Sequence, residues 1–471
     1  MNIKTLIGVA AAIVLSGCTM MPKYERPPLP VPDQFPAPPA AKADSTGSAA
    51  AIGSAPVAPG WQEYFPDARL RTVIEQALAN NRDLRVAALN VERAAALFRI
   101  QRSELSPTIG IQAAAGKTQV PERMTSSGNT ETTAQYSVEV GFLSWEIDLF
   151  GRLRSLKARA LEQYLASEEA QRAVRASLVA AVASSWLKLA ADTERLHLAE
   201  ATITAQTDTR DLVKASYDAG VASNLDLSQA ESQVETARAS RAEFAGAVGV
   251  DRHALELLVG SSLSDDLLSK DLSELAELPP LAAGLPSEVL LARPDILAAE
   301  HQLRAANANI GAARAAFFPH ISLTAAFGTL SPDLSHLFAS GTDSWRYQPI
   351  VQTPIFAGGG LRANLKETQV EREIAVAAYE KAIQSAFAEV ADALTLRSTL
   401  LEEREAWDRL LVSLEETLTL SDARYKAGLD GYLGVLVAQR SLYFSQQTGV
   451  ALRLAETANR VALYKALGGG S

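Results

Sequence analysis

Two short stretches decide the fold, Leu105-Ser-Pro-Thr-Ile-Gly-Ile-Gln-Ala-Ala-Ala-Gly116 and Phe317-Phe-Pro-His-Ile-Ser-Leu-Thr-Ala-Ala-Phe-Gly328. They lie 212 positions apart and share a proline, an isoleucine, two alanines and a glycine. Asp83 and Asp295 keep this offset upstream, whereas Ile147 and Ile355 are 208 apart. A repeat of this length predicts two halves built on one plan, with four extra residues in the first half between about 117 and 140.

Alternation of apolar with small or polar residues marks four segments. In the first half, apolar residues alternate over 109–113 and again over 136–142, and in the second half they alternate over 321–327. The fourth segment, 345–356, is weaker because it contains two prolines. A period of two with one apolar face predicts four half-buried strands in each chain.

Long stretches without glycine or proline follow the strands of each half. Residues 152–219 and 361–427 contain neither, over 68 and 67 residues, and both are rich in strong helix formers. Each predicts a helix roughly 100 Å long, typical of a coiled-coil-like arrangement. Gly220 and Gly428 follow these helices at a natural stop position, and further helices are expected at 224–260 and 431–467. Each half therefore predicts a long helical hairpin. A further helix is expected before the strands of each half, over 67–104 in the first and 293–315 in the second.

The only cysteine of the chain, Cys18, follows a short apolar run. Leu6–Leu15 is too short to span a bilayer as a helix, which needs about 20 residues. Leu15-Ser-Gly-Cys18 resembles the bacterial lipobox, which implies a diacylglyceryl group on the sulfur and an acyl group on the amine of Cys18. The alternative is an ordinary signal peptide with an incidental cysteine. Thr19, where an inner-membrane retention signal has aspartate, implies sorting to the outer membrane.

Residues 19–66 contain 11 of the 21 prolines. Because proline interrupts helices and central strands, this segment predicts an extended arm leading away from the lipid anchor.

Composition excludes several function classes. The net charge of −10 offers no basic stripe for nucleic acid. No serine-hydrolase elbow, zinc-protease motif or phosphate-binding loop is present, and the five histidines are scattered without ligand spacing. We expect neither enzymatic activity nor a metal, and no cofactor besides the lipid on Cys18.

Four strands in one chain cannot close a membrane barrel, which needs at least about eight. Open strand edges cannot face lipid, because their backbone groups would lack hydrogen-bond partners. Three copies would supply twelve strands and twelve hairpin helices. This geometry does not by itself exclude a dimer.

Several strings along the chain resemble one protein family. They are Leu15-Ser-Gly-Cys18, Tyr24-Glu-Arg-Pro27, Trp61 with Phe65, Asn81-Arg-Asp-Leu84, Ser144-Trp-Glu-Ile-Asp-Leu-Phe-Gly-Arg152, Ala292-Arg-Pro-Asp-Ile-Leu-Ala-Ala-Glu300, Phe317-Phe-Pro-His-Ile-Ser-Leu323, Thr353-Pro-Ile-Phe-Ala-Gly-Gly359, Arg424-Tyr-Lys-Ala-Gly428 and Val437-Ala-Gln-Arg440. Together they resemble the TolC-like outer-membrane factors, in the lipoprotein branch (OprM and NodT type) that serves RND efflux pumps.

The resemblance implies a membrane α+β fold. It consists of a homotrimeric 12-stranded outer-membrane β-barrel continuous with a 12-helix periplasmic α-barrel. The implied function is a gated, passive exit duct for drugs or other small toxic compounds. The implied partners are a periplasmic adaptor (membrane fusion) protein, an inner-membrane RND transporter and outer-membrane lipid, and the implied location is the outer membrane with a large periplasmic part.

The expected domain organisation follows from the repeat and the resemblance. It comprises a signal peptide (1–17), a lipid-anchored arm (18–66), the first repeat (67–261), an equatorial linker (262–292), the second repeat (293–467) and a short tail (468–471).

The resemblance also implies a gate near the ends of the hairpins. Leu433 and Val437 are four residues apart and share a helical face. Relatives often carry leucine and aspartate at these positions, and some are acidic at the position of Gly434, so this chain implies an apolar constriction that gates by dewetting. The implied gate residues are Leu225, Asp226, Tyr425, Asp430, Leu433 and Val437.

Within this gate, a hydrogen bond from Tyr425 to Asp226 is our hypothesis for the closed state. Repulsion from Asp430 should weaken it. The alternative is that Asp226 only caps a helix start.

A docking site for the adaptor is implied around Tyr217, Gly220, Tyr425 and Gly428. The alternative is that these tyrosines only pack the hairpin ends.

Two other functions stay open from the sequence alone. One is a TolC-like exit duct of a type I secretion system. The other is a structural coiled-coil lipoprotein without a pore, against which the paired alternating segments argue.

Overall fold

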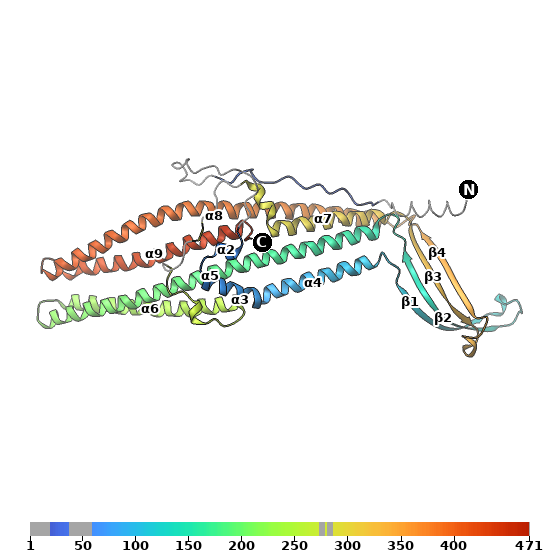
Figure 1. Ribbon diagram of the computed structural model, residues 1–471, viewed down its shortest axis with the longest axis horizontal. Coiled ribbons are helices and arrows are strands. Elements are labelled where there is room, and N and C mark those ends of the chain that lie inside the picture. Colours follow the sequence, from blue (N-terminus) through green and yellow to red (C-terminus); the bar gives the residue numbers. More distant parts are fainter. Residues whose placement is uncertain (1–18, 37–58, 273–277, 280–285, 471) are drawn as a thin grey trace. The chain divides into compact units, whose positions relative to one another are not determined.

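The computed structural model describes residues 19–36, 59–272, 278–279 and 286–470 (Figure 1). Cys18, the expected signal peptide and part of the arm lie outside these residues. Packing divides the chain into two compact units. Unit 1 comprises Met1–Pro28, Asn90–Glu168 and Ala298–Tyr379, and unit 2 comprises Leu29–Leu89, Glu169–Leu297 and Glu380–Ser471. Each unit contains parts of both sequence repeats, and the expected domain division stays a prediction.

Unit 1 contains a four-stranded antiparallel sheet with the order β1-β2-β3-β4. Its strands are β1 (Ile109–Val120), β2 (Glu131–Glu146), β3 (His320–Ser331) and β4 (Asp343–Gln352). All four expected strands are confirmed, although the fourth ends before the second of the two prolines in the segment 345–356. Pro349 lies opposite Leu323 on β4, an edge strand, where a residue without an N–H group is tolerated.

The two faces of this sheet differ chemically, because directly paired residues share a face. One row across the sheet is Ile111, Val140, Phe327 and Trp345, and the adjacent row is Gln112, Glu139, Gly328 and Ser344. The expectation of half-buried strands is wrong for the single chain, since Ile111 is 77% exposed and Trp345 is 78% exposed. Within the part of the chain that the structure describes, no element covers this apolar face.

Unit 2 contains most of the two hairpins (Figure 1). Helix α5 (Arg152–Asp218) pairs with α6 (Asn224–Val259), and α8 (Gly360–Lys426) pairs with α9 (Tyr432–Ala466). These bounds confirm the expected hairpins. Among the described residues, one helix, α5, has a window long and apolar enough to cross a membrane, but half of that window is buried inside the chain.

The helix expected over 67–104 is two helices, α3 (Ala68–Asn80) and α4 (Arg82–Ser103). Asn81 separates them with an extended backbone (φ −61°, ψ 131°). Its side-chain oxygen accepts a hydrogen bond from the N–H of Leu84 (2.8 Å), and its amide donates to the carbonyl of Leu258 (2.8 Å). The Asn81 side chain thus caps α4 and binds another element, and these hydrogen bonds offset the backbone hydrogen bonds lost where the helix is interrupted.

The expectation that residues 19–66 form no helix is wrong at their end, where α2 (Trp61–Tyr64) forms a single turn. Trp61, Tyr64 and Phe65 are buried there, and the Tyr64 ring stacks on Tyr464 with centroids 4.1 Å apart. The remaining elements of the described residues are α7 (Pro294–Ala315), as expected, and four short 3-10 turns, η1 (Glu122–Met124), η2 (Asp265–Leu267), η3 (Ser287–Ala292) and η4 (Leu334–His336).

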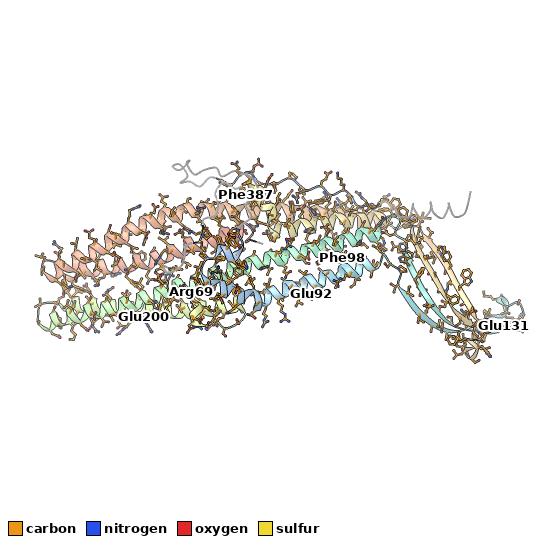
Figure 2. The ribbon with its side chains drawn as sticks, viewed as in Figure 1. Arg69, Glu92, Phe98, Glu131, Glu200 and Phe387 are labelled. Atoms are coloured by element: carbon orange, nitrogen blue, oxygen red, sulfur yellow. The ribbon has the colours of Figure 1, made fainter. Side chains whose placement is uncertain are left out.

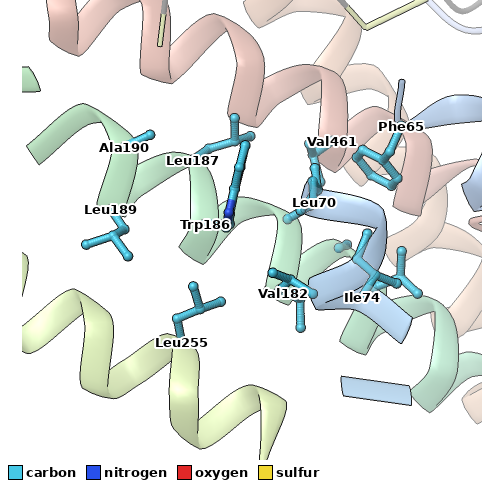
Figure 3. Close-up of a cluster of buried hydrophobic side chains, with 14 of the residues drawn as sticks. Phe65, Leu70, Ile74, Val182, Trp186, Leu187, Leu189, Ala190, Leu255 and Val461 are labelled. Atoms are coloured by element: carbon cyan, nitrogen blue, oxygen red, sulfur yellow. The ribbon is translucent and has the colours of Figure 1, made fainter. Parts of the chain in front are cut away.

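The main apolar core of unit 2 surrounds Trp186 on α5 (Figure 3). Leu70 and Ile74 of α3, Leu255 of α6 and Val461 of α9 contribute to it. Trp186 is 1% exposed, and its indole N–H donates to the carbonyl of Leu267 (3.0 Å). This core joins both hairpins, so each hairpin extends from a fixed base.

Candidate functional site

The free ends of both hairpins are built by the same turn. At the first, the N–H of Gly220 donates to the carbonyl of Tyr217 (2.9 Å), and the N–H of Val221 donates to Ser216 (2.9 Å). At the second, Gly428 donates to Tyr425 (2.9 Å), and Leu429 donates to Arg424 (3.0 Å). The φ angles of Gly220 and Gly428 are 76° and 69°. These are Schellman motifs, in which a left-handed glycine satisfies the last helical carbonyls.

An apolar cluster near these ends joins all four hairpin helices. We define the tip cluster by its buried residues Val213, Ala230, Tyr432, Val435 and Leu436. The Tyr425 ring packs against it, with its centroid 5.6 Å from that of Tyr432. Burial raises the pKa of Tyr432 to about 12. The packing interpretation therefore has direct support for Tyr425, whereas Tyr217 is 40% exposed and available to a partner.

Asp226 caps its own helix. Its carboxylate accepts hydrogen bonds from the N–H (3.0 Å) and the hydroxyl (2.6 Å) of Ser223, and the Ser223 hydroxyl accepts from the N–H of Asp226 (3.2 Å). This reciprocal pair is a capping box. The pKa of Tyr425 is raised, first by burial and then by the nearby Asp226 charge. Among the hydrogen bonds of the described residues, none joins Tyr425 to Asp226, and the tether stays a prediction for another state.

Asp430 does not act as expected. We expected its charge to repel Asp226, but the Arg424 guanidinium binds the Asp430 carboxylate through two contacts of 2.5 and 3.1 Å. This ion pair holds the pKa of Asp430 below its usual value. Sequence reasoning missed Arg424, although it lies within a quoted string, because a pair six residues apart forms only across a turn.

The apolar side chains of the expected gate are exposed in the single chain. Leu433 is 58% exposed, Val437 is 55% exposed and Leu225 is 65% exposed. Val437 borders a cleft of about 420 Å³ that is also lined by Gln206, Gln439 and Tyr443. Apolar side chains this exposed at one end of a hairpin are typical of a surface that a partner or another copy of the chain covers.

The surroundings of Gly220 and Gly428 are open, since a Cβ added at either would meet nothing within 4 Å. Space for a docking partner therefore exists at both turns, and adaptor docking there stays a prediction.

The arm is bound to unit 1 by a buried carboxylate that sequence reasoning did not single out. Glu300 on α7 is 3% exposed. It accepts hydrogen bonds from Tyr24 (3.1 Å), from Arg26 (3.0 and 2.7 Å) and from Arg304 (2.7 Å). The Arg304 guanidinium also lies over the Tyr24 ring at 5.0 Å. We call these four residues the arm clamp.

The arm runs antiparallel to α7. Asn307 donates to the carbonyl of Pro22 (2.9 Å), and Arg314 donates to the carbonyl of Met20 (3.5 Å). The residues next to Cys18 therefore lie at the end of α7 that leads into β3. Within unit 2, the arm continues with the Phe35 ring stacked on that of Phe387, and the two ring centroids are 4.9 Å apart. Phe387 lies on α8 and is labelled in Figure 2.

Among the described residues, no group of three or more His, Cys, Asp or Glu side chains could hold a metal ion.

Comparison with known proteins identifies the family that shares this architecture. The family model described as "Outer membrane efflux protein" matches residues 73–261 and 285–469. The toluene efflux pump outer membrane protein TtgC of Pseudomonas putida is 44% identical, over 99% of this chain and 96% of its own length.

Solved structures agree with this match. A membrane protein from Pseudomonas aeruginosa has a TM-score of 0.88 at 39% identity, covering 96% of this chain and 98% of that one. The open state of the MtrE outer membrane channel of Neisseria gonorrhoeae has a TM-score of 0.85 at 37% identity, with the same coverage. The TolC-like channel fold and the outer-membrane location expected from the sequence are confirmed. The chain belongs to the outer membrane efflux protein family and is the outer-membrane channel of an efflux pump.

Proposed function

We propose that three copies of this chain close into one pore, which serves as the passive exit duct of a tripartite RND-type efflux pump. The observation that carries the proposal is the sheet. Its apolar face is exposed and would face lipid, and its edge strands β1 and β4 have no strand partner among the described residues, so they need strands from other copies. Three sheets of four strands make a barrel of ordinary size with its apolar face toward lipid and its polar face toward water.

The lipid anchor is part of this proposal. Acyl groups on Cys18 would enter the membrane close to the strands, because the arm places its neighbours at the end of α7 that leads into β3. Burial alone would raise the pKa of Glu300, but the hydrogen bonds from Arg26 and Arg304 lower that pKa below its usual value. The Glu300 carboxylate at the centre of the arm clamp is therefore ionised at neutral pH.

The proposed partners are a periplasmic adaptor at the hairpin turns and an inner-membrane transporter that supplies the energy. TtgC is named for toluene efflux. We infer a cargo of small, largely apolar toxic compounds for this chain. An apolar ring made by Leu433 and Val437 from three copies suits a resting gate, because water leaves a narrow apolar constriction and ions cannot cross it.

The test is single-channel recording of the purified protein in planar bilayers. The double variant Leu433→Ser, Val437→Ser should raise the conductance by wetting the gate. Val412→Ser is a matched control, because Val412 is 66% exposed on α8 and has no proposed gate role, and it should leave conductance unchanged. Absence of any conductance from trimers of the double variant would favour a structural lipoprotein over a duct.

A further inference from the structure

One ion pair lies on the polar face of the sheet, away from the strand ends. Nη2 of Arg346 on β4 lies 2.5 Å from Oε2 of Glu139 on β2. The strand between them, β3, has only Ala326 and Gly328 at the positions paired with these two residues. Small side chains leave room for the arginine to cross β3 and reach the carboxylate.

The exposed fractions of the two partners are unequal. The Glu139 side chain is 13% exposed, whereas that of Arg346 is 49% exposed. The carboxylate is therefore largely covered, and the guanidinium faces the solvent. A cation in this position neutralises the carboxylate for any ion passing along this face.

Other charges on this face lie near the strand ends. Glu146 at the end of β2 is bound by Arg152 (2.9 and 2.5 Å), and Glu131 lies at the first position of the same strand. At the proposed gate, Leu433, Gly434 and Val437 carry no charge. Within the described strand residues, the central part of the polar face thus has Glu139 and Arg346 as its charged groups.

We propose that the Glu139–Arg346 pair sets the ion selectivity of the membrane end of the duct, with Arg346 suppressing a ring of three Glu139 carboxylates. The inference rests on the proposed trimeric duct, in which the polar face lines the pore. The ion selectivity then depends on the balance between a negative ring of Glu139 carboxylates and a positive ring of Arg346 guanidinium groups. Removal of one ring leaves the charge of the other unneutralised.

The experiment measures the reversal potential of single channels in a potassium chloride gradient, in the chain with Leu433→Ser and Val437→Ser, so that the gate does not limit the current. Arg346→Gln should shift the reversal potential toward the value for potassium, and Glu139→Gln should shift it toward that for chloride. The double variant should return close to the parent. The shifts should be larger near 0.1 M salt than near 1 M, since the screening length falls from about 10 Å to about 3 Å.

Lys117→Gln is the matched control. Lys117 on β1 pairs with Ala134 in a row of the opposite, apolar face, so its loss removes a positive charge outside the pore and should leave the reversal potential unchanged. Conducting Arg346→Gln and Glu139→Gln channels with the parent reversal potential at low salt would overturn the inference while leaving the duct intact. Absence of conductance in the parent and in every variant would instead contradict the proposed function. If Arg346→Gln fails to assemble, Glu139→Gln alone decides, because loss of the carboxylate must still shift the reversal potential toward the value for chloride.

Discussion

At the residue scale, the arm clamp shows how a single buried carboxylate can position an otherwise extended segment. Proline content predicts that the arm has no regular structure, and this holds over 19–30. It does not predict what the arm binds, because Glu300 lies about 275 residues away and only the fold brings it to Tyr24 and Arg26.

Replacing Glu300 with glutamine should release the arm, because two arginines lose their charged partner. We expect a loss of about 1.5–3 kcal/mol in the free energy of unfolding, the usual range for hydrogen bonds to charged groups. Thermal unfolding and protease cleavage between 19 and 36 measure this loss. Glu92→Gln, an exposed change on α4, should alter neither. If the arm resists protease equally well in both variants, Glu300 does not hold the arm in place.

The same carboxylate gives a pH dependence. The pKa of Glu300 is lowered below its ordinary value of 4.5 in the folded chain. The stabilisation is therefore fully present above about pH 4.5 and is lost as the pH falls through the lowered pKa. Protease cleavage of the arm should increase only in that acidic range. An arm equally accessible at pH 7 and at low pH would contradict this.

At the element scale, periodicity predicts the strands and the long helices well. The hairpin bounds follow from the absence of glycine and proline, and the turns follow from Gly220 and Gly428. The break at Asn81 could not be predicted, since residues on both sides have helical spacing and the break depends on a contact with Leu258. The Arg424–Asp430 pair was missed for a similar reason, because it depends on the geometry of the turn.

Gly428→Val should destabilise the second hairpin end by about 1–2 kcal/mol, because a left-handed backbone disfavours a side chain even in open space. Gly434→Ala is the matched change in a helical and equally open position, and it should be neutral or stabilising. Hydrogen exchange of the backbone amides near the turn should be faster in Gly428→Val and unchanged or slower in Gly434→Ala. Loss of pump activity in Gly428→Val with unchanged exchange would instead point to adaptor docking at this turn.

Gly141 and Gly328 allow close approach of β2 and β3. A Cβ on Gly141 would overlap the backbone carbonyl oxygen of Ala325. Gly141→Val should therefore prevent pairing of these strands and abolish membrane insertion, as measured by heat-modifiable migration of the trimer in gels. Gly110→Val, in the same row but with nothing within 4 Å of the added Cβ, should still insert. Normal insertion of Gly141→Val would show that the sheet tolerates a different register.

At the scale of the whole molecule, the sequence predicts that one chain cannot form a closed barrel by itself, because it supplies only four strands. The expectation of half-buried strands was wrong because no described residue of the chain covers their apolar face, and in our proposal lipid covers it. The same exposure of Ile111, Trp345, Leu433 and Val437 that contradicts a self-contained fold is what an assembled channel requires. Stoichiometry depends on barrel closure and cannot be derived from one chain's packing.

The lipid is expected to be dispensable for assembly. Cys18→Ala with an ordinary signal-peptidase site should still give trimers in the outer membrane, because in our proposal the strands span the membrane and the lipid on Cys18 only anchors the arm. Membrane fractionation and gel migration measure this. A wholly soluble, monomeric variant would make the lipid the true attachment and would argue against a barrel.

The central claim, closure of three chains through β1 and β4, is tested most directly by cysteine cross-linking of these edges. In the Cys18→Ala background the chain has no cysteine, so one cysteine among residues 112–116 and one among 344–348 can be introduced in pairs. Because the sheet order separates β1 from β4 within a chain, a disulfide between them must join neighbouring copies. Oxidation in outer membranes should give dimers first and then covalent trimers, with no larger species. Products that stop at dimers, extend beyond trimers or never form in any register would contradict the account.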